Sequence, residues 1–233
     1  MPSPRGAWLA PRAECDAFKI AVGVQPNGLA FDAARNILIV ANLGDAALPD
    51  AHSVSVINID RRERVAEIKV PGTTRWSLYD EAREMFFVNI SSPGQIIGID
   101  ARDPSKIART IEVPAIGPHG LDFDAATGRL LCACDAAVLI AIDATSGRPL
   151  GEVALSGPPD VIFLHPQSRR LYVAIGNPGV IDVIDVIDID KLRREEVVPT
   201  ERGAHTLAID RKRHKIYAFL PQSHRAAVFA QAG

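Results

Sequence analysis

Two short apolar runs decide the fold: Gly28-Leu29-Ala30-Phe31-Asp32 and, after a short polar turn, Ile37-Leu38-Ile39-Val40. The motif, an apolar residue before Asp or His and another apolar residue six positions later, recurs along the chain. The recurring pairs are Phe31-Asp32, Tyr79-Asp80, Phe123-Asp124, Leu164-His165 and Ile209-Asp210. Their second members are 48, 44, 41 and 45 residues apart. Five copies at this period indicate a repeat architecture.

Each repeat is predicted to form four short β-strands. The first strand ends at the recurring pair, and the third usually closes on an Ile-Asp pair, as at Ile59-Asp60 and Ile99-Asp100. The second strands are apolar at consecutive positions, which is typical of strands that are buried on both faces. Antiparallel sheets bury both faces when they stack around an axis. The sequence therefore predicts an all-β fold, a β-propeller of four-stranded antiparallel blades.

The two ends of the chain predict how the ring closes. The last repeat supplies three strands, ending in residues 226–229, and residues 18–22 form a lone strand before the first repeat. Pairing of these segments would complete the last blade and remove the open sheet edges. We therefore predict a five-bladed propeller, a single domain over residues 18–233, after an N-terminal extension over residues 1–17. The alternative is a shortened form of a larger propeller, whose exposed edge would favour self-association.

Composition and charge argue against several function classes. Lys and Arg number 26 against 28 Asp and Glu, a net charge of −2, which argues against nucleic-acid binding. No apolar run reaches the ~18 residues of a membrane span. No secretory signal is visible, so we expect a cytoplasmic protein, or a periplasmic or secreted one if a leader has been removed. Cys132 and Cys134 are predicted to be buried thiols, with half of a metal site as the alternative.

One polar residue stands five positions before the second member of each recurring pair. These residues are Asn27, Arg75, His119, Asp160 and His205. The first strand of a propeller blade is innermost, so their side chains are predicted to ring one mouth of the central channel. They form either a hydrated, hydrogen-bonded plug or a ligand or metal site, because Asn, Asp and His supply oxygen and imidazole donors.

The loops between second and third strands open on the same face as this ring. Loops on a rigid scaffold are where binding residues tend to be found. They hold the further candidate ligand-binding residues Asn42, His52 and His224, and also Asp135. The alternative for each of these residues is a solvated turn with no binding role.

The sequences Pro26-Asn27-Gly28-Leu29-Ala30-Phe31-Asp32 and Pro118-His119-Gly120-Leu121-Asp122-Phe123-Asp124 resemble the YVTN and lactonase-like β-propeller repeats. They are similar also to gluconolactonase and virginiamycin-lyase propellers. In the gluconolactonase type, an Asn and an Asp in such positions hold a metal, and Asn27 and Asp160 resemble them. His119 or His205 stands where that family has its acidic third ligand. In the lyase type the His of Pro-His-Gly is functional, and His119 resembles it.

Two functions are consistent with these observations. The first is a ligand- or protein-binding propeller that takes a small molecule or peptide at the channel mouth, with no nucleic-acid or membrane partner. The second, which the resemblance implies, is a metal-dependent lactonase-like hydrolase or lyase with one divalent metal ion. Its metal ligands would be Asn27, His119, Asp160 and His205, and its catalytic residues His119, His205 and Arg75. We prefer the first because neither enzyme pattern is complete.

Overall fold

The computed structural model describes residues 18–45, 47–48, 51–189 and 191–230. The predicted N-terminal extension, residues 1–17, therefore lies outside the described residues. Within these ranges the regular elements are all β-strands, joined by turns and short loops. Nothing helical in the same ranges is long and apolar enough to cross a membrane.

The strands form five antiparallel sheets, and the order of the strands in each sheet follows the chain. Sheet 1 holds β1 (Pro26–Asp32), β2 (Ile37–Asn42), β3 (Ser53–Asn58) and β4 (Glu63–Lys69). Sheet 2 holds β5 (Thr74–Asp80), β6 (Met85–Ile90), β7 (Gln95–Asp100) and β8 (Arg109–Glu112). Sheet 3 holds β9 (Pro118–Asp124), β10 (Arg129–Cys134), β11 (Val138–Asp143) and β12 (Pro149–Ala154).

The last two sheets differ in their number of strands. Sheet 4 holds β13 (Ile162–His165), β14 (Arg170–Ile175), β15 (Val180–Asp185) and β16 (Arg193–Pro199). Sheet 5 holds β17 (Leu207–Asp210), β18 (Lys215–Leu220) and β19 (Arg225–Ala230). The predicted repeat boundaries therefore coincide with the boundaries of the sheets.

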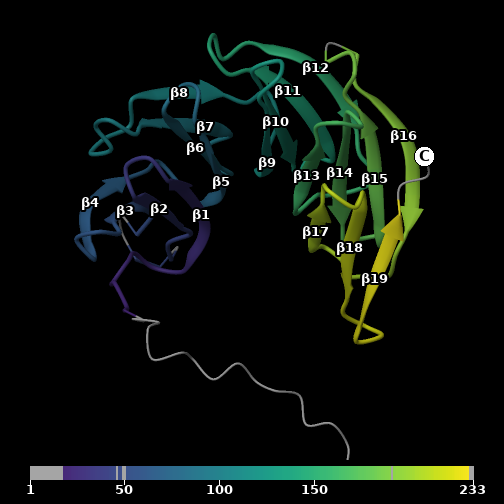
Figure 1. The fold of residues 1–233 in the computed structure, drawn as a ribbon, viewed down its shortest axis with the longest axis horizontal. Coiled ribbons are helices and arrows are strands. Elements are labelled where there is room, and N and C mark those ends of the chain that lie inside the picture. The colour runs from purple at the N-terminus through teal and green to yellow at the C-terminus, as the bar shows by residue number, and fades with distance from the viewer. Residues whose placement is uncertain (1–17, 46, 49–50, 190, 231–233) are drawn as a thin grey trace, which may run out of the picture.

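The five sheets follow one another in an arc, with sheet 1 at one end and sheet 5 at the other (Figure 1). The first strands are innermost, and each contacts the first strand of the next sheet, in the order β1, β5, β9, β13, β17. This arrangement is that of a propeller-like fold. The prediction of an all-β fold built from repeated antiparallel sheets is confirmed.

The hydrophobic core lies between consecutive sheets. Ile39 and Val54 of sheet 1 pack against Phe86 and Val88 of sheet 2, and equivalent clusters join each later pair of sheets. In each of sheets 2 to 4, the second strand is buried along its length except at its first residue. The consecutive apolar residues of these strands are therefore explained, since each strand is covered by a sheet on either side.

The recurring Asp serves the turn that follows the first strand. Asp32 Oδ1 accepts a hydrogen bond from the backbone N–H of Ala34 at 2.9 Å, and Asp80 Oδ1 accepts one from Ala82 at 3.1 Å. Each Asp thus closes a tight turn by binding the backbone two residues on. This local role accounts for the recurrence of the acid without any function in binding.

The predicted closing strand is not confirmed. Residues 18–22 form no strand, and sheet 5 has three strands, with β19 at its edge. Contacts with sheet 1 hold the N-terminal segment there instead. The Arg62 guanidinium lies 5.0 Å from the centre of the Phe18 ring, and the Gly23 N–H donates to Ser55 Oγ at 3.1 Å. The segment that was expected to join the two ends therefore lies on the first sheet.

The paired cysteines are buried free thiols, as predicted. Cys132 Sγ and Cys134 Sγ are 3.8 Å apart on one face of β10. The hydrogen bond with the neighbouring Cys134 thiol, together with burial, raises the pKa of Cys132 well above its ordinary value. Both thiols are therefore part of the core between sheets 2 and 3.

Candidate functional site

A β-bulge near the start of the first strand presents the predicted polar residues. In sheet 1 the residues on either side of Asn27 pair with consecutive residues of β2, which leaves Asn27 as the extra residue. His119 has the same position in sheet 3, and Arg75 lies in the corresponding interruption of sheet 2. Bulges turn a side chain out of the ladder and are frequent beside functional sites. The same backbone device thus recurs at equivalent positions in three sheets.

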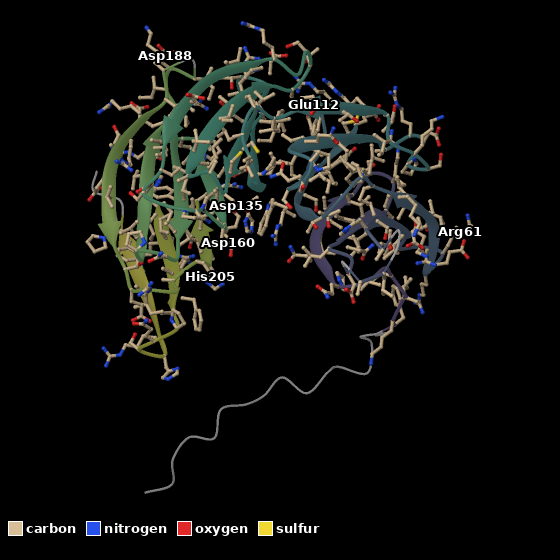
Figure 2. All side chains as sticks on the ribbon, turned by 180° about the vertical axis from the view of Figure 1, so that it is seen from behind. Arg61, Glu112, Asp135, Asp160, Asp188 and His205 are labelled. Carbon is tan, nitrogen blue, oxygen red and sulfur yellow. The ribbon has the colours of Figure 1, made fainter. Side chains whose placement is uncertain are left out.

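The structure joins three of the five predicted residues. His119 lies at the start of β9, and Asp160 and His205 stand two residues before β13 and β17, the first strands of sheets 4 and 5. Asp135 from the β10–β11 turn joins them. Figure 2 shows Asp135, Asp160 and His205 one after the other on the concave side of the arc. We call these four residues the His–Asp cluster.

Both ring nitrogens of His119 face carboxylates. His119 Nδ1 is 2.8 Å from Asp135 Oδ1, and His119 Nε2 is 3.4 Å from Asp160 Oδ1. The other oxygen of Asp160 lies 3.9 Å from His205 Nε2. His205 Nδ1 donates to the carbonyl oxygen of Gly203 at 2.7 Å. Asp160 therefore links the two imidazoles.

The electrostatics of the cluster favour a protonated His119. Burial lowers the pKa of His119, but the contacts with Asp160 and Asp135 outweigh burial, so the pKa lies above its ordinary value. Hydrogen bonds to a charged group are about twice as strong as neutral ones. One imidazole between two carboxylates can offset the charge of at most one of them.

Two features fix the backbone and side-chain positions of His119 and Asp135. The buried Asn89 side chain donates through Nδ2 to the carbonyl oxygens of His119 and Gly120, at 3.0 and 3.2 Å. Gly117 has a φ of +73°, and a Cβ added there would lie 2.7 Å from Asp135 Cβ. A glycine is therefore required where the chain passes Asp135.

The sequence analysis did not identify the role of Asn89 or the pairing of Asp135 with His119. Asp135 could be placed on the correct face from its loop. Its contact with His119 depends on the register of β9 against β10, in which Cys134 pairs with Pro118. The bulge that sets this register has no distinct signal in the sequence. Asn89 looks like any polar residue that interrupts an apolar strand.

Among the described residues, the other predicted site residues make no direct contact of this kind with the cluster. Asn27 is exposed, and Arg75 is partly buried. In the part of the chain that the structure describes, no hydrogen bond or ion pair joins either residue to the cluster, and the buried Arg75 Nε has no partner. Asn42 is buried and donates through Nδ2 to Ser53 Oγ and Ser55 Oγ, both at 3.1 Å. Asn42 thus ties the strands of sheet 1 together.

The two remaining histidines belong to separate loops. His52 Nδ1 donates to the carbonyl oxygen of Leu43 at 2.5 Å, which fixes the ring within the β2–β3 loop. His224 is exposed in the β18–β19 turn with a φ of +55°. No hydrogen bond or ion pair connects either ring with the His–Asp cluster in the described ranges. Their predicted roles in ligand binding stay predictions.

The metal-binding role of Asn27, His119, Asp160 and His205 stays a prediction. Within the described ranges no group of three or more His, Cys, Asp and Glu side chains is placed to hold a metal ion. A ligating imidazole presents an unprotonated nitrogen to the metal. Both nitrogens of His119 face carboxylates instead, so a metal there would displace at least one of these contacts. The geometry of the cluster therefore favours a proton on His119.

The fold places the chain among proteins of propeller-like architecture. No family model matches the sequence, and no curated protein matches it. The Kuenenia stuttgartiensis hydrazine synthase structure is similar, with a TM-score of 0.59 and 17% identity over 91% of this chain and 85% of that chain. A chain of the mitotic checkpoint complex aligns with a TM-score of 0.74 and 8% identity, over 88% of this chain and 61% of that chain. At such identities the likeness shows the fold alone.

Proposed function

We propose that this chain is a non-catalytic β-propeller-type binding module, and that the His–Asp cluster receives a cationic group of a peptide or protein partner. The observation that carries the proposal is the pair of carboxylates of Asp135 and Asp160, fixed on either side of one imidazole. Each carboxylate has oxygen lone pairs in excess of those that face His119. These lone pairs are the acceptors that an ammonium or guanidinium group needs.

The exposure of the cluster favours a peptide over a small molecule. The side chains of Asp135 and Asp160 are 38% and 33% exposed, and that of His205 is 52% exposed. Small-molecule sites bury most of their ligand in a concave pocket. A partly open cluster on the concave side of the arc is better suited to one side chain of a larger partner.

Preorganisation supports the same function. His119, Asn89 and Gly117 hold Asp135 and its neighbours in place before a ligand arrives, so binding does not have to order these side chains. His119 can neutralise at most one of the two carboxylates. A partner cation therefore completes the neutralisation of the cluster.

Arg75 gives the proposed site a second point of recognition. It lies on the neighbouring first strand, is partly buried, and makes no ion pair with any described residue. A buried or partly buried guanidinium is costly without an anion or hydrogen-bond acceptor. An acidic side chain of the partner, near the basic one, would satisfy it. The expected ligand is thus a peptide that carries both charges.

A peptide array tests this proposal. Immobilised peptides of mixed sequence are probed with the wild-type chain and with Asp160→Asn. The wild-type chain should select peptides rich in Lys or Arg, and Asp160→Asn should lose that selection. Asp103→Asn, on a loop at the opposite end of sheet 2, is the matched control and should bind as the wild type does. Equal selection by wild type and Asp160→Asn would refute the proposal.

The alternative function, a metal-dependent lactonase, predicts a different experimental result. Hydrolysis of a lactone by the purified chain, abolished by a chelator and by His119→Ala, would favour that enzyme over the binding module. We expect no such chelator-sensitive hydrolysis, because His119 faces a carboxylate at each nitrogen.

A further inference from the structure

An apolar surface lies on the outer face of sheet 5, at one end of the arc. We define this face by Ala208, Tyr217, Phe219, Ala226 and Val228, which pair across β17, β18 and β19. Phe219 is 52% exposed and Val228 is 56% exposed. The centre of the face is hollowed by a shallow cavity of about 220 Å³. Contiguous apolar surface of this kind marks an interaction site.

Sheet 4 uses the same positions to bind sheet 5. A shift of 45 residues along the sequence carries Tyr172, Ala174, Ile181 and Val183 onto residues of the outer face of sheet 5. The strand register is also the same, since Tyr172 pairs with Val183 as Tyr217 pairs with Val228. In sheet 4 these four residues are buried against the next sheet. The outer face of sheet 5 is therefore suited to bind another sheet in the way that sheet 4 binds sheet 5.

The complementary face is found at the other end of the arc. Leu207, Ile209, Ile216 and Ala218 are the residues of sheet 5 that pack on sheet 4. The same positions relative to the recurring pair in sheet 1 are Leu29, Phe31, Leu38 and Val40, which we call the outer face of sheet 1. Leu29 is 61% exposed and Phe31 is 45% exposed. Val40 is only 4% exposed, because its cross-strand neighbour Ser55 accepts a hydrogen bond from the N–H of Gly23 and the N-terminal segment covers this part of the face. The exposed part of the outer face of sheet 1 is therefore its innermost strand, with Leu29 and Phe31.

Charges at the turns next to these faces also match. At the sheet 1–sheet 2 boundary, Arg35 binds Asp32 of its own turn at 3.0 Å and reaches Glu84 of the next sheet. Arg213 occupies the position of Arg35 in sheet 5 and binds its own Asp210 at 2.9 Å. Glu84 stands four residues after the recurring Asp80 of sheet 2. The equivalent residue of sheet 1 is Asn36, which donates to the exposed carboxylate of Asp60 at 3.0 Å.

We propose that copies of this chain associate head to tail, with the outer face of sheet 5 of one copy on the outer face of sheet 1 of another. At the innermost strand of sheet 1 the contact repeats the interface that joins each sheet to the next within the chain, and Arg213 of one copy approaches Asp60 of the other. The two faces stand at opposite ends of the arc (Figure 1), which suits a contact between copies. Because the two faces differ, the contact is heterologous and leaves one face of each type open at the ends of the assembly.

Two double variants test the proposal. Phe219→Lys/Val228→Lys blocks the face of sheet 5, and Leu29→Lys/Phe31→Lys blocks that of sheet 1. All four positions are exposed, so circular dichroism and thermal melting should show that both variants fold. Light scattering coupled to size exclusion then measures the mass over a wide range of protein concentration. The wild-type mass should rise with concentration, and each variant alone should remain monomeric.

The mixture of the two variants distinguishes the head-to-tail contact from other contacts. Each variant keeps the face that the other lacks, so an equimolar mixture should form a dimer with one copy of each and nothing larger. Three results would overturn the proposal. They are a wild-type chain that stays monomeric at every concentration, self-association of the variant blocked on sheet 1, and a mixture that remains monomeric. The second result would indicate a symmetric contact between two copies of sheet 5.

Discussion

Trp76 and Phe163 meet edge to face, with ring centres 6.4 Å apart and ring planes at 81°, although their strands belong to sheets 2 and 4. Trp76 also packs against the cluster between sheets 2 and 3 and the cluster between sheets 4 and 5. One side chain on an innermost strand thus contacts residues from several sheets. It couples sheets that are not neighbours in the chain.

Trp76→Ala is therefore expected to destabilise the whole arc. Truncation of a packed Trp costs about 3–5 kcal/mol where it is fully buried, and Trp76 is partly buried, so we expect roughly 2–4 kcal/mol in the free energy of unfolding. Urea unfolding followed by circular dichroism measures the loss. Trp76→Phe keeps an aromatic ring and should lose less. An equal loss in both variants would contradict the role of the ring contact.

The pKa of His119 should fall when Asp135 is replaced by Asn. Burial lowers this pKa, and the contacts with Asp160 and Asp135 raise it further than burial lowers it. Titration of the histidine ring protons by NMR measures the change, with Asp103→Asn as control. Because the folded pKa is the higher one, the contacts of His119 stabilise the fold at acid pH. Their contribution should be lost as the pH rises through the folded pKa.

The sequence was sufficient to predict the repeated sheets, because runs of consecutive apolar residues and turn chemistry are local. The recurring Asp32 and its equivalents mark turns that their own carboxylates close. The closing of the ring could not be predicted in the same way. Residues 18–22 have the composition of a strand, but the segment lies on sheet 1, where Gly23 binds Ser55 and Phe18 stacks on Arg62.

The candidate site was predicted in part, because the position of its residues in the repeat is a local property but their contacts are not. His119, Asp160 and His205 each stand five residues before the second member of a recurring pair. At this position the chain approaches the innermost strand of every sheet from the same end, so the three residues could be grouped. The side-chain contacts depend on bulges and on distances between sheets, which no local pattern encodes. Asn42 has the residue type of a ligand, but its amide is used within sheet 1.

The buried His165 is expected to make the fold sensitive to acid. His165 is buried, and its Nε2 lies 3.0 Å from Nδ1 of His214. Burial and the nearby charge of His214 lower the pKa of His165. The unfolded chain therefore binds a proton at this position more readily than the folded chain, and the contribution of His165 to the free energy of unfolding should fall as the pH drops below about 6.5.

Urea unfolding of the wild type, His165→Leu and His224→Ala between pH 5 and 8 measures this dependence. His165→Leu should show a weaker fall in stability toward acid pH, because it leaves no buried imidazole at this position. His224→Ala removes an exposed imidazole and should follow the wild type. A slope in His165→Leu equal to that of the wild type would rule out His165 as the source.

Arg169→Ala is expected to weaken the contact between sheets 3 and 4 and so to destabilise the fold. Arg169 donates to both carboxylate oxygens of Asp124, at 2.8 and 2.6 Å, and to the carbonyl oxygen of Val186 at 2.8 Å. The Asp124 side chain is 1% exposed, so removal of its partner leaves a buried charge and should cost about 3–5 kcal/mol in the free energy of unfolding. Arg102→Ala is the matched control, because Arg102 pairs with Asp100 in solvent and its removal should cost much less. Urea unfolding at neutral pH compares them, and a loss for Arg169→Ala no larger than that for Arg102→Ala would show that this ion pair does not hold the sheets together.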